Sequence, residues 1–288
     1  MKFYKDDLIY ALLCTLLIQA NITAQSIIWS DTSDIKSKVL YTKSYEKDNL
    51  DIRIFRSINN SRNKLKDNIF DVVDRSVIFT TILTPLSQFA VSNAEGNVYD
   101  ENSAIILVAS EIINFGLVYS TKTLVRRKRP YQSLNNVYTR KAFGDDKYSF
   151  PSGHSSFTFT MATSYLLRYP QYPLVYMPVF AYALLTSYGR PYFGMHYPSD
   201  ILAGALYGIS SAIIAYSVRK PLIEFKSRFT GNNTEDETSV RSLNSLYFCT
   251  SFALSAIINT FILKNNETVK LNTSPEAYGI RFMTGIRF

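Results

Sequence analysis

Six long runs with almost no charged residues constrain what this chain can fold into. Each run is 18 to 22 residues long, close to the ~20 residues that an α-helix needs to cross a bilayer. Glu111 is the one charged residue in them. The runs are Ser76–Ala94, Ser103–Thr121, Ser149–Leu167, Tyr169–Gly189, Ile201–Val218 and Ser242–Leu263. We therefore expect an all-α fold, a bundle of about six apolar, membrane-spanning helices. A large soluble helical protein is the alternative.

The composition indicates a folded chain with anionic partners. Apolar residues make up 47% of the 288 residues, which argues against disorder. The net charge of +8 suits a membrane surface, a nucleic acid or a phosphate. The chain has two cysteines, Cys14 and Cys249, and two histidines, His154 and His196. These numbers argue against a disulfide framework and against a Cys/His zinc site.

The distribution of charge divides the chain into five parts. Lys2 and Lys5 precede an apolar stretch and a small-residue site at Ala24, which predicts a signal peptide or an uncleaved N-terminal anchor. In the second part, Leu50 and Ile54 recur at helical spacing, as in a helix on an anionic membrane or an ordinary solvated amphipathic helix. The predicted parts are the signal or anchor (1–24), the polar amphipathic region (25–75), the helical core (76–218), a polar loop (219–241) and a C-terminal helix and tail (242–288).

The first of three blocks that carry chemistry runs from Lys122 to Pro130, at the end of an apolar run. On one helix, Lys122 and Arg129 would lie two turns apart and converge on one anion, and Pro130 would end that helix. An Arg guanidinium holds two phosphate oxygens as a planar fork, and a Lys ammonium adds a point charge for a third. By itself, the block is also typical of basic residues that flank a membrane span.

The second block is Pro151-Ser152-Gly153-His154, at the start of an apolar run. Ser152 can cap the helix, and Gly153 lets backbone N–H groups come close to a ligand. The N-terminus of a helix favours an anion, and His154 can donate a proton to a leaving oxygen. The alternative is a capped helix start with an incidental histidine.

The third block is Arg190-x5-His196-x3-Asp200. Arg190 offers a further fork for phosphate oxygens. Asp200 can accept a hydrogen bond from one ring nitrogen of His196, which leaves the other nitrogen able to attack. The alternative for this block is a histidine in an ordinary loop between helices.

Together the three blocks resemble the type 2 phosphatidic acid phosphatase/haloperoxidase superfamily, in its membrane lipid-phosphatase branch. Ten specified positions match in the same order, and both histidines of the chain are among them. One position departs from the pattern, because the third block commonly begins Ser-Arg and here it begins Gly189-Arg190. The departure affects one hydroxyl contact and leaves the histidine in place.

The resemblance implies a phosphoric ester hydrolase that works through a phosphohistidine, with no metal or other cofactor. His196 would be the nucleophile and Asp200 its orienting partner, while His154 would protonate the leaving alkoxide and later activate water. The implied substrates are phosphate monoesters or pyrophosphates of lipids, of the phosphatidic acid, phosphatidylglycerophosphate, prenyl pyrophosphate or lipid A type. The groups implied to hold the phosphoryl oxygens are Lys122, Arg129, Ser152, the Gly153 backbone and Arg190.

Counting the crossings from an exported N-terminus places all three blocks on the outside. The basic 219–241 segment then lies inside, as the positive-inside rule requires. We therefore expect a protein of the bacterial inner membrane whose active site faces the periplasm, with a soluble periplasmic location as the alternative. A phosphorylated lipid and the membrane are the expected partners, and a nucleic acid is not. The sequence does not indicate an oligomeric state.

Three rival functions stay open at this point. A vanadium-dependent haloperoxidase would hold vanadate in the same cradle of cations. A soluble periplasmic acid phosphatase would use the same residues without a membrane. A non-enzymatic protein that binds anionic lipid headgroups would not need the His196–Asp200 pair.

Overall fold

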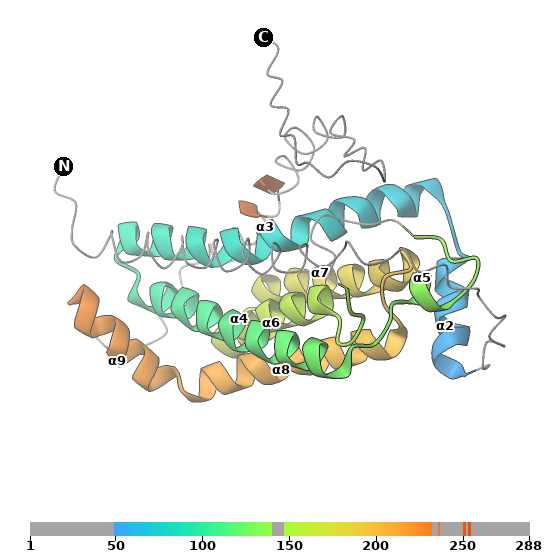
Figure 1. The fold of residues 1–288 in the computed structure, drawn as a ribbon. Coiled ribbons are helices and arrows are strands. Elements are labelled where there is room, and N and C mark those ends of the chain that lie inside the picture. The colour runs from blue at the N-terminus through green and yellow to red at the C-terminus, as the bar shows by residue number, and fades with distance from the viewer. Residues whose placement is uncertain (1–48, 140–146, 232–235, 237–249, 252, 255–288) are drawn as a thin grey trace, which may run out of the picture.

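The computed structural model describes residues 49–139, 147–231, 236, 250, 251, 253 and 254. Within these residues the regular secondary structure is entirely helical (Figure 1), which confirms the predicted all-α fold. The predicted signal or anchor and nearly all of the C-terminal part lie outside the described residues. The helices are α2 (Leu50–Asn59), α3 (Lys64–Glu95), α4 (Val98–Val125), α5 (Pro130–Ser133), α6 (Gly153–Arg168), α7 (Pro173–Tyr192), α8 (Pro198–Ser217) and α9 (Arg219–Thr230).

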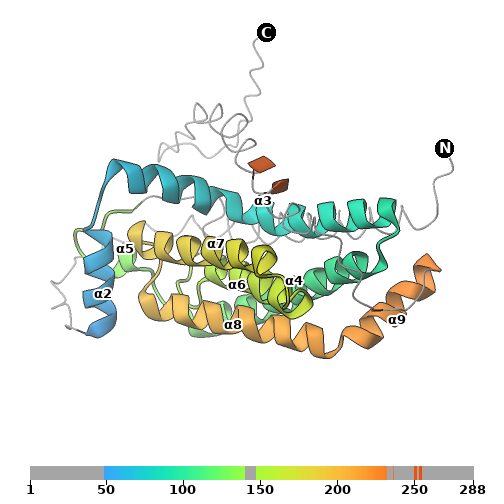
Figure 2. The ribbon, with the colours of Figure 1, turned by 180° about the vertical axis from the view of Figure 1, so that it is seen from behind.

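Five long helices, α3, α4, α6, α7 and α8, form the bundle (Figures 1 and 2). The central helix is α6, which packs against the other four. The short helices α2 and α5 lie at one end of the bundle, and α9 lies at the other end (Figures 1 and 2). The two ends can therefore carry different functions.

The bundle interior combines an apolar cluster with hydrogen-bonded polar side chains. Ser76 on α3 bonds Tyr182 on α7 at 2.7 Å, and Ser164 on α6 bonds Ser110 on α4 at 3.2 Å. Polar groups that form hydrogen bonds to one another inside a bundle lose little free energy when they leave water. The largest apolar cluster includes Val73, Val77, Leu107, Met161 and Val179.

These inward polar residues explain a difference from the sequence expectation. Within the described residues, two stretches are long and apolar enough to cross a membrane, Val98–Ser133 and Pro198–Ser217. The first contains α4 and α5, and the second is α8. The predicted runs in α3, α6 and α7 are interrupted by Ser, Thr and Pro residues, many of which face other helices.

Close packing of α8 against α6 depends on two glycines in a G-x-x-x-G pair. A Cβ atom at Gly204 would lie 2.5 Å from the Ser152 carbonyl oxygen, and one at Gly208 would lie 2.8 Å from the Thr160 amide nitrogen. A side chain at either position would push the helices apart, because real Cβ contacts are longer. The pair therefore fixes the distance between the helices that carry Asp200 and His154.

Two predicted boundaries differ from the structure. Helix α3 begins at Lys64, so the boundary predicted at residue 76 falls inside a helix. The segment 219–241, predicted as a polar loop, begins instead with α9. Two residues of this polar segment, Ile223 and Lys226, are buried against the middle and the start of α4. This packing stabilises α9 as a helix.

Candidate active site

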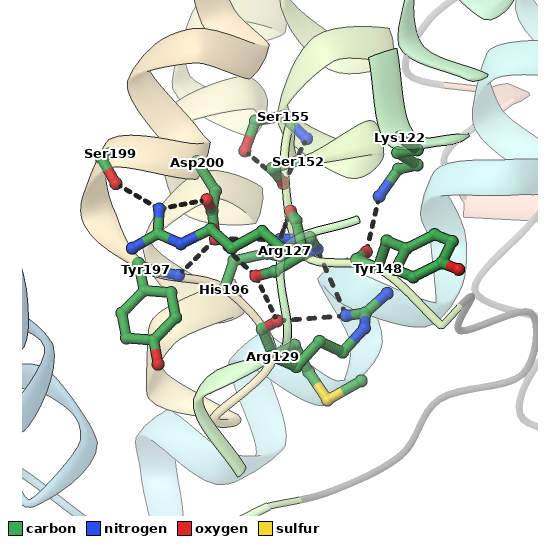
Figure 3. A network of polar contacts seen from close by, with 12 residues as sticks. Lys122, Arg127, Arg129, Tyr148, Ser152, Ser155, His196, Tyr197, Ser199 and Asp200 are labelled. Carbon is green, nitrogen blue, oxygen red and sulfur yellow. Dashed lines mark hydrogen bonds and ion pairs between the residues drawn. The ribbon is translucent and has the colours of Figure 1, made fainter. Parts of the chain in front are cut away.

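The three blocks meet at the end of the bundle where α2 and α5 lie. The C-terminus of α4, the N-terminus of α6 and the connection from α7 to α8 all reach this end (Figure 1). Figure 3 shows Lys122, Arg129, Ser152 and His196 gathered there with Asp200. The three blocks thus bring together residues that lie up to 78 positions apart in the chain, from 122 to 200.

The sequence analysis expected Lys122 and Arg129 to share one helix, but the structure places them on different segments. Helix α4 ends at Val125, because Arg126 adopts a left-handed conformation with φ of 51° and turns the chain. Pro130 begins α5 rather than ending α4. Lys122 therefore approaches from the last turn of α4, and Arg129 approaches from the residue before α5.

His196 is buried, and its two ring nitrogens have different neighbours. Nδ1 lies 2.7 Å from the Ser149 carbonyl oxygen, and Nε2 lies 3.4 Å from a guanidinium nitrogen of Arg129. A carbonyl oxygen can only accept, so neutral His196 carries its proton on Nδ1 and a lone pair on Nε2. The nitrogen with the lone pair thus faces a cation.

Asp200 contacts His196 less directly than the sequence analysis expected. Its Oδ2 atom is 3.7 Å from His196 Nδ1, which is longer than a hydrogen bond. The same oxygen accepts from the Ser149 hydroxyl at 2.5 Å and from the Tyr197 backbone N–H at 2.8 Å. Oδ1 accepts from Arg127 at 2.6 Å. Asp200 therefore holds the two segments that flank the His196 ring.

The second block forms the expected capped helix start. Ser152 is the N-cap of α6, and its side chain accepts from the Ser155 N–H at 3.5 Å. The Ser152 N–H donates to the Asp200 carbonyl at 2.9 Å, which ties α6 to the start of α8. His154, in the first turn of α6, keeps 14% of its side chain exposed, so it can reach a ligand.

Asp74 on α3 is a member of the site that the sequence analysis missed. Its carboxylate forms a buried ion pair with Arg190, and it lies 4.0 Å from His154 Nε2. Helical spacing could have indicated Asp74, because it lies on the same helix face as Phe70 and Val77, and both of these residues are buried. A carboxylate on a buried helix face requires a cation nearby.

Positive charge outweighs negative charge among the buried residues of the site, with Lys122, Arg129 and Arg190 against Asp74 and Asp200. Lys122 donates to the Tyr148 carbonyl at 2.9 Å, and Arg129 donates to the Met195 carbonyl at 3.1 Å. Carbonyl oxygens carry no net charge, so these contacts do not neutralise the cations. With the N-terminus of α6 beside them, the cations can bind a phosphate-sized anion.

Arg127 and Tyr197 lie at the outer side of the site. The Arg127 guanidinium stacks over the Tyr197 ring at 4.1 Å. Burial raises the pKa of the Tyr197 phenol, which therefore stays protonated at neutral pH. Among the described residues, no group of three or more His, Cys, Asp or Glu side chains could hold a metal ion.

Comparison with known proteins finds similarity over the segment that carries most of this site. A model described as the PAP2 superfamily matches residues 103–224. An undecaprenyl-diphosphatase of Sulfolobus acidocaldarius is 36% identical over 104 residues, 36% of this chain and 49% of that protein. Sphingosine-1-phosphate phosphatase 1 of Mus musculus is 35% identical over 114 residues, 38% of this chain and 25% of that protein. The matches thus span about half and a quarter of these relatives.

Two solved structures resemble the chain. The crystal structure of Aquifex aeolicus LpxE has a TM-score of 0.48 and 29% identity, and covers 60% of this chain and 98% of that one. The crystal structure of the first transmembrane PAP2 type phosphatidylglycerolphosphate phosphatase from Bacillus subtilis has a TM-score of 0.45 and 18% identity. That match covers 69% of this chain and 93% of the other.

Proposed function

We propose that the protein is a membrane phosphatase acting on phosphorylated lipids, on the premise that residues 103–224, which match the PAP2 superfamily model, form a domain of that family. The observation that carries the proposal is the pairing of His196 Nε2 with Arg129 at 3.4 Å, while Nδ1 faces a carbonyl. An attacking nitrogen beside a phosphate-binding cation is the arrangement that phosphoryl transfer to histidine requires.

In the proposed first step, His196 Nε2 attacks phosphorus and the bond from phosphorus to the leaving oxygen breaks. The Nδ1 proton stays on the ring and bonds the Ser149 carbonyl, while Asp200 stabilises the positive charge that the ring acquires. His154 gives its proton to the leaving alkoxide. In the second step, His154 removes a proton from water, which attacks the phosphohistidine and releases phosphate.

The proposed phosphate-binding groups are those of the sequence analysis. Lys122, Arg129 and Arg190 would hold the phosphoryl oxygens, with Ser152 and the Gly153 backbone at the N-terminus of α6. Fixed cations stabilise the charge on the transferring group without reorganising during the reaction. The cations lie at the end of helices whose outer faces are apolar, which suits a phosphate group carried on a lipid.

The relatives support a lipid substrate with a terminal phosphate. One is named for a polyprenyl diphosphate and the other for a phosphorylated sphingoid base, and these share a terminal phosphate on a long apolar chain. Exposed Leu184 on α7, with Leu202 and Leu206 on α8, would face lipid. We propose that the substrate enters from the membrane and that the site faces the periplasm.

Rapid-quench labelling with a phosphate-radiolabelled lipid tests the mechanism. We expect His196→Ala to release no phosphate and to trap no phosphoenzyme. His154→Ala is expected to form some phosphoenzyme from a substrate with a good leaving group, because that step needs little acid assistance, and to hydrolyse it slowly. A phosphoenzyme that persists in His196→Ala would overturn the proposal. A panel of lipid and soluble phosphate esters would define the substrate.

Cysteine labelling tests the proposed orientation. Lys147 is exposed at the site end and Lys220 is exposed at the other end, and either can be replaced by Cys in a background without Cys14 and Cys249. We expect a membrane-impermeant reagent to label Lys147→Cys in intact cells with a permeabilised outer membrane. Lys220→Cys should be labelled only after the inner membrane is opened. Labelling of both from the same side would contradict the arrangement.

A further inference from the structure

Arg127 forms a bridge between two carboxylates on different helices. One guanidinium nitrogen lies 2.6 Å from Asp200 Oδ1, and the other lies 2.7 Å from Asp51 Oδ2. Figure 3 shows the Arg127 guanidinium beside Asp200 and Ser199. An Arg fork that meets two carboxylates fixes both in direction as well as distance. Arg127 falls between Lys122 and Arg129 in the first block, yet it does not join them at the proposed phosphate site.

Asp51 also caps the helix that carries Asp200. Its Oδ1 atom accepts from the Ser199 backbone N–H at 2.8 Å, and Oδ2 accepts from the Ser199 hydroxyl at 2.6 Å. Ser199 lies in the first turn of α8, where backbone N–H groups have no partner within the helix. Asp51 thus fixes the start of α8 both directly and through Arg127.

Helix α2, which carries Asp51, is itself held firmly at this end. Phe55 is completely buried and its ring packs 5.8 Å from the Tyr197 ring. The Asn59 side-chain amide donates to the carbonyls of Tyr138 and Tyr192 at 2.9 and 3.0 Å. This helix precedes the PAP2 match, which starts at residue 103, so its contribution lies outside the domain that the match defines.

We propose that Asp51 and Arg127 are positioning residues for the phosphatase reaction, acting through Asp200 on His196. The inference rests on the proposed function. Asp200 accepts from Ser149, and the Ser149 carbonyl sets the His196 ring. Without Arg127, the Asp200 carboxylate would lose the contact on Oδ1 and rotate, which would misalign the Ser149 carbonyl and His196 Nε2.

Kinetics of Arg127→Gln and Asp51→Asn test the inference. We expect kcat to fall about 10- to 100-fold, by analogy with the partners that orient a metal-ligating histidine through its other ring nitrogen. KM should stay within about 3-fold, because the proposed phosphate-binding cations are untouched. The double variant should be no slower than the slower single variant, since both changes break one chain of contacts.

Arg75→Gln is the matched control, because its ion pair with Asp71, at 2.8 Å and 26% exposed, does not involve Asp200.

Nitrogen-15 NMR of histidine-labelled protein gives a readout that does not depend on activity. The chain has two histidines, so His196→Ala assigns the His196 signals without ambiguity. We expect the Nδ1-protonated tautomer in the wild type and in Arg75→Gln, and a mixture of tautomers in Arg127→Gln and Asp51→Asn. Thermal unfolding in detergent shows whether each variant is folded.

The outcomes separate this inference from the proposed function. A folded wild type that releases no phosphate from any lipid ester would overturn the proposed function. The His196 tautomer in the variants would still test whether the Arg127 bridge orients that histidine. An active wild type with variants that match Arg75→Gln in both kcat and tautomer would overturn the inference. Variants that lose activity only in proportion to lost folded protein, with the wild-type tautomer, would also overturn it, because the bridge would then be structural.

Discussion

At the end of the bundle opposite the candidate site, Lys226 on α9 lies 3.2 Å from Glu101 and donates to Asn102 at 2.7 Å. At the same end, Arg168 meets both oxygens of Asp236 at 2.8 and 2.6 Å. In each case a carboxylate lies beside a cation, and Asp236 also lies 3.9 Å from Arg219. Opposite charges paired in this way offset part of the cost of leaving water.

The candidate site buries more cations than carboxylates: Lys122, Arg129 and Arg190 against Asp74 and Asp200. Asp74 pairs with Arg190, while Lys122 also donates to the Tyr148 carbonyl and Arg129 to the Met195 carbonyl. Burying a cation beside a neutral acceptor costs more than burying it beside a carboxylate. The comparison teaches that the end with paired charges is suited to stabilise the fold, whereas the end with an excess of buried cations is suited to bind an anion.

The largest expected effect on activity tests the comparison at the site end. Arg129→Gln should lower kcat/KM by about 10²- to 10³-fold, as for the loss of one transition-state donor. Its free energy of unfolding should change less than its activity, because buried Asp74 keeps its ion pair with Arg190. Phosphate release and thermal unfolding in detergent measure the two effects. Lys128→Gln, an exposed neighbour, is the control. An Arg129→Gln protein as active as this control would contradict the assignment.

The second prediction breaks the comparison at the opposite end. Lys226→Gln should lower the free energy of unfolding by about 3–5 kcal/mol, because Glu101 would remain buried without a cation. The side chains of this pair are only 2% and 3% exposed, so water cannot replace the lost partner. The activity of the protein that stays folded should be unchanged. Lys220→Gln, on the exposed side of α9, should affect neither quantity. Loss of activity without loss of stability would reverse the roles of the two ends.

The third and smallest effect tests the packing of α8 against α6. Gly204→Ala and Gly208→Ala should each destabilise the protein by about 1–3 kcal/mol through overpacking. Gly204→Ala should also lower activity per folded molecule, because its Cβ would meet the carbonyl of the α6 N-cap, Ser152. Gly116→Ala is the matched control, since a Cβ there meets nothing within 4 Å. Equal unfolding temperatures for all three variants would refute the close contact.

The sequence predicted the elements of this protein that depend on local order. The apolar runs predicted the bundle, and Ser152 before an apolar run predicted the cap of α6. The spacing within each block also predicted that His196 and Asp200 would lie near each other, because four residues across a helix start bring side chains close.

Only the tertiary structure decided the partners of those residues. Asp74 lies 116 positions from Arg190, and Asp51 lies 148 positions from Ser199. No local pattern encodes contacts over such separations, because they arise when whole helices pack. The Ser149 carbonyl is invisible in a sequence for a simpler reason: every residue has one, and only the fold brings this one to His196 Nδ1.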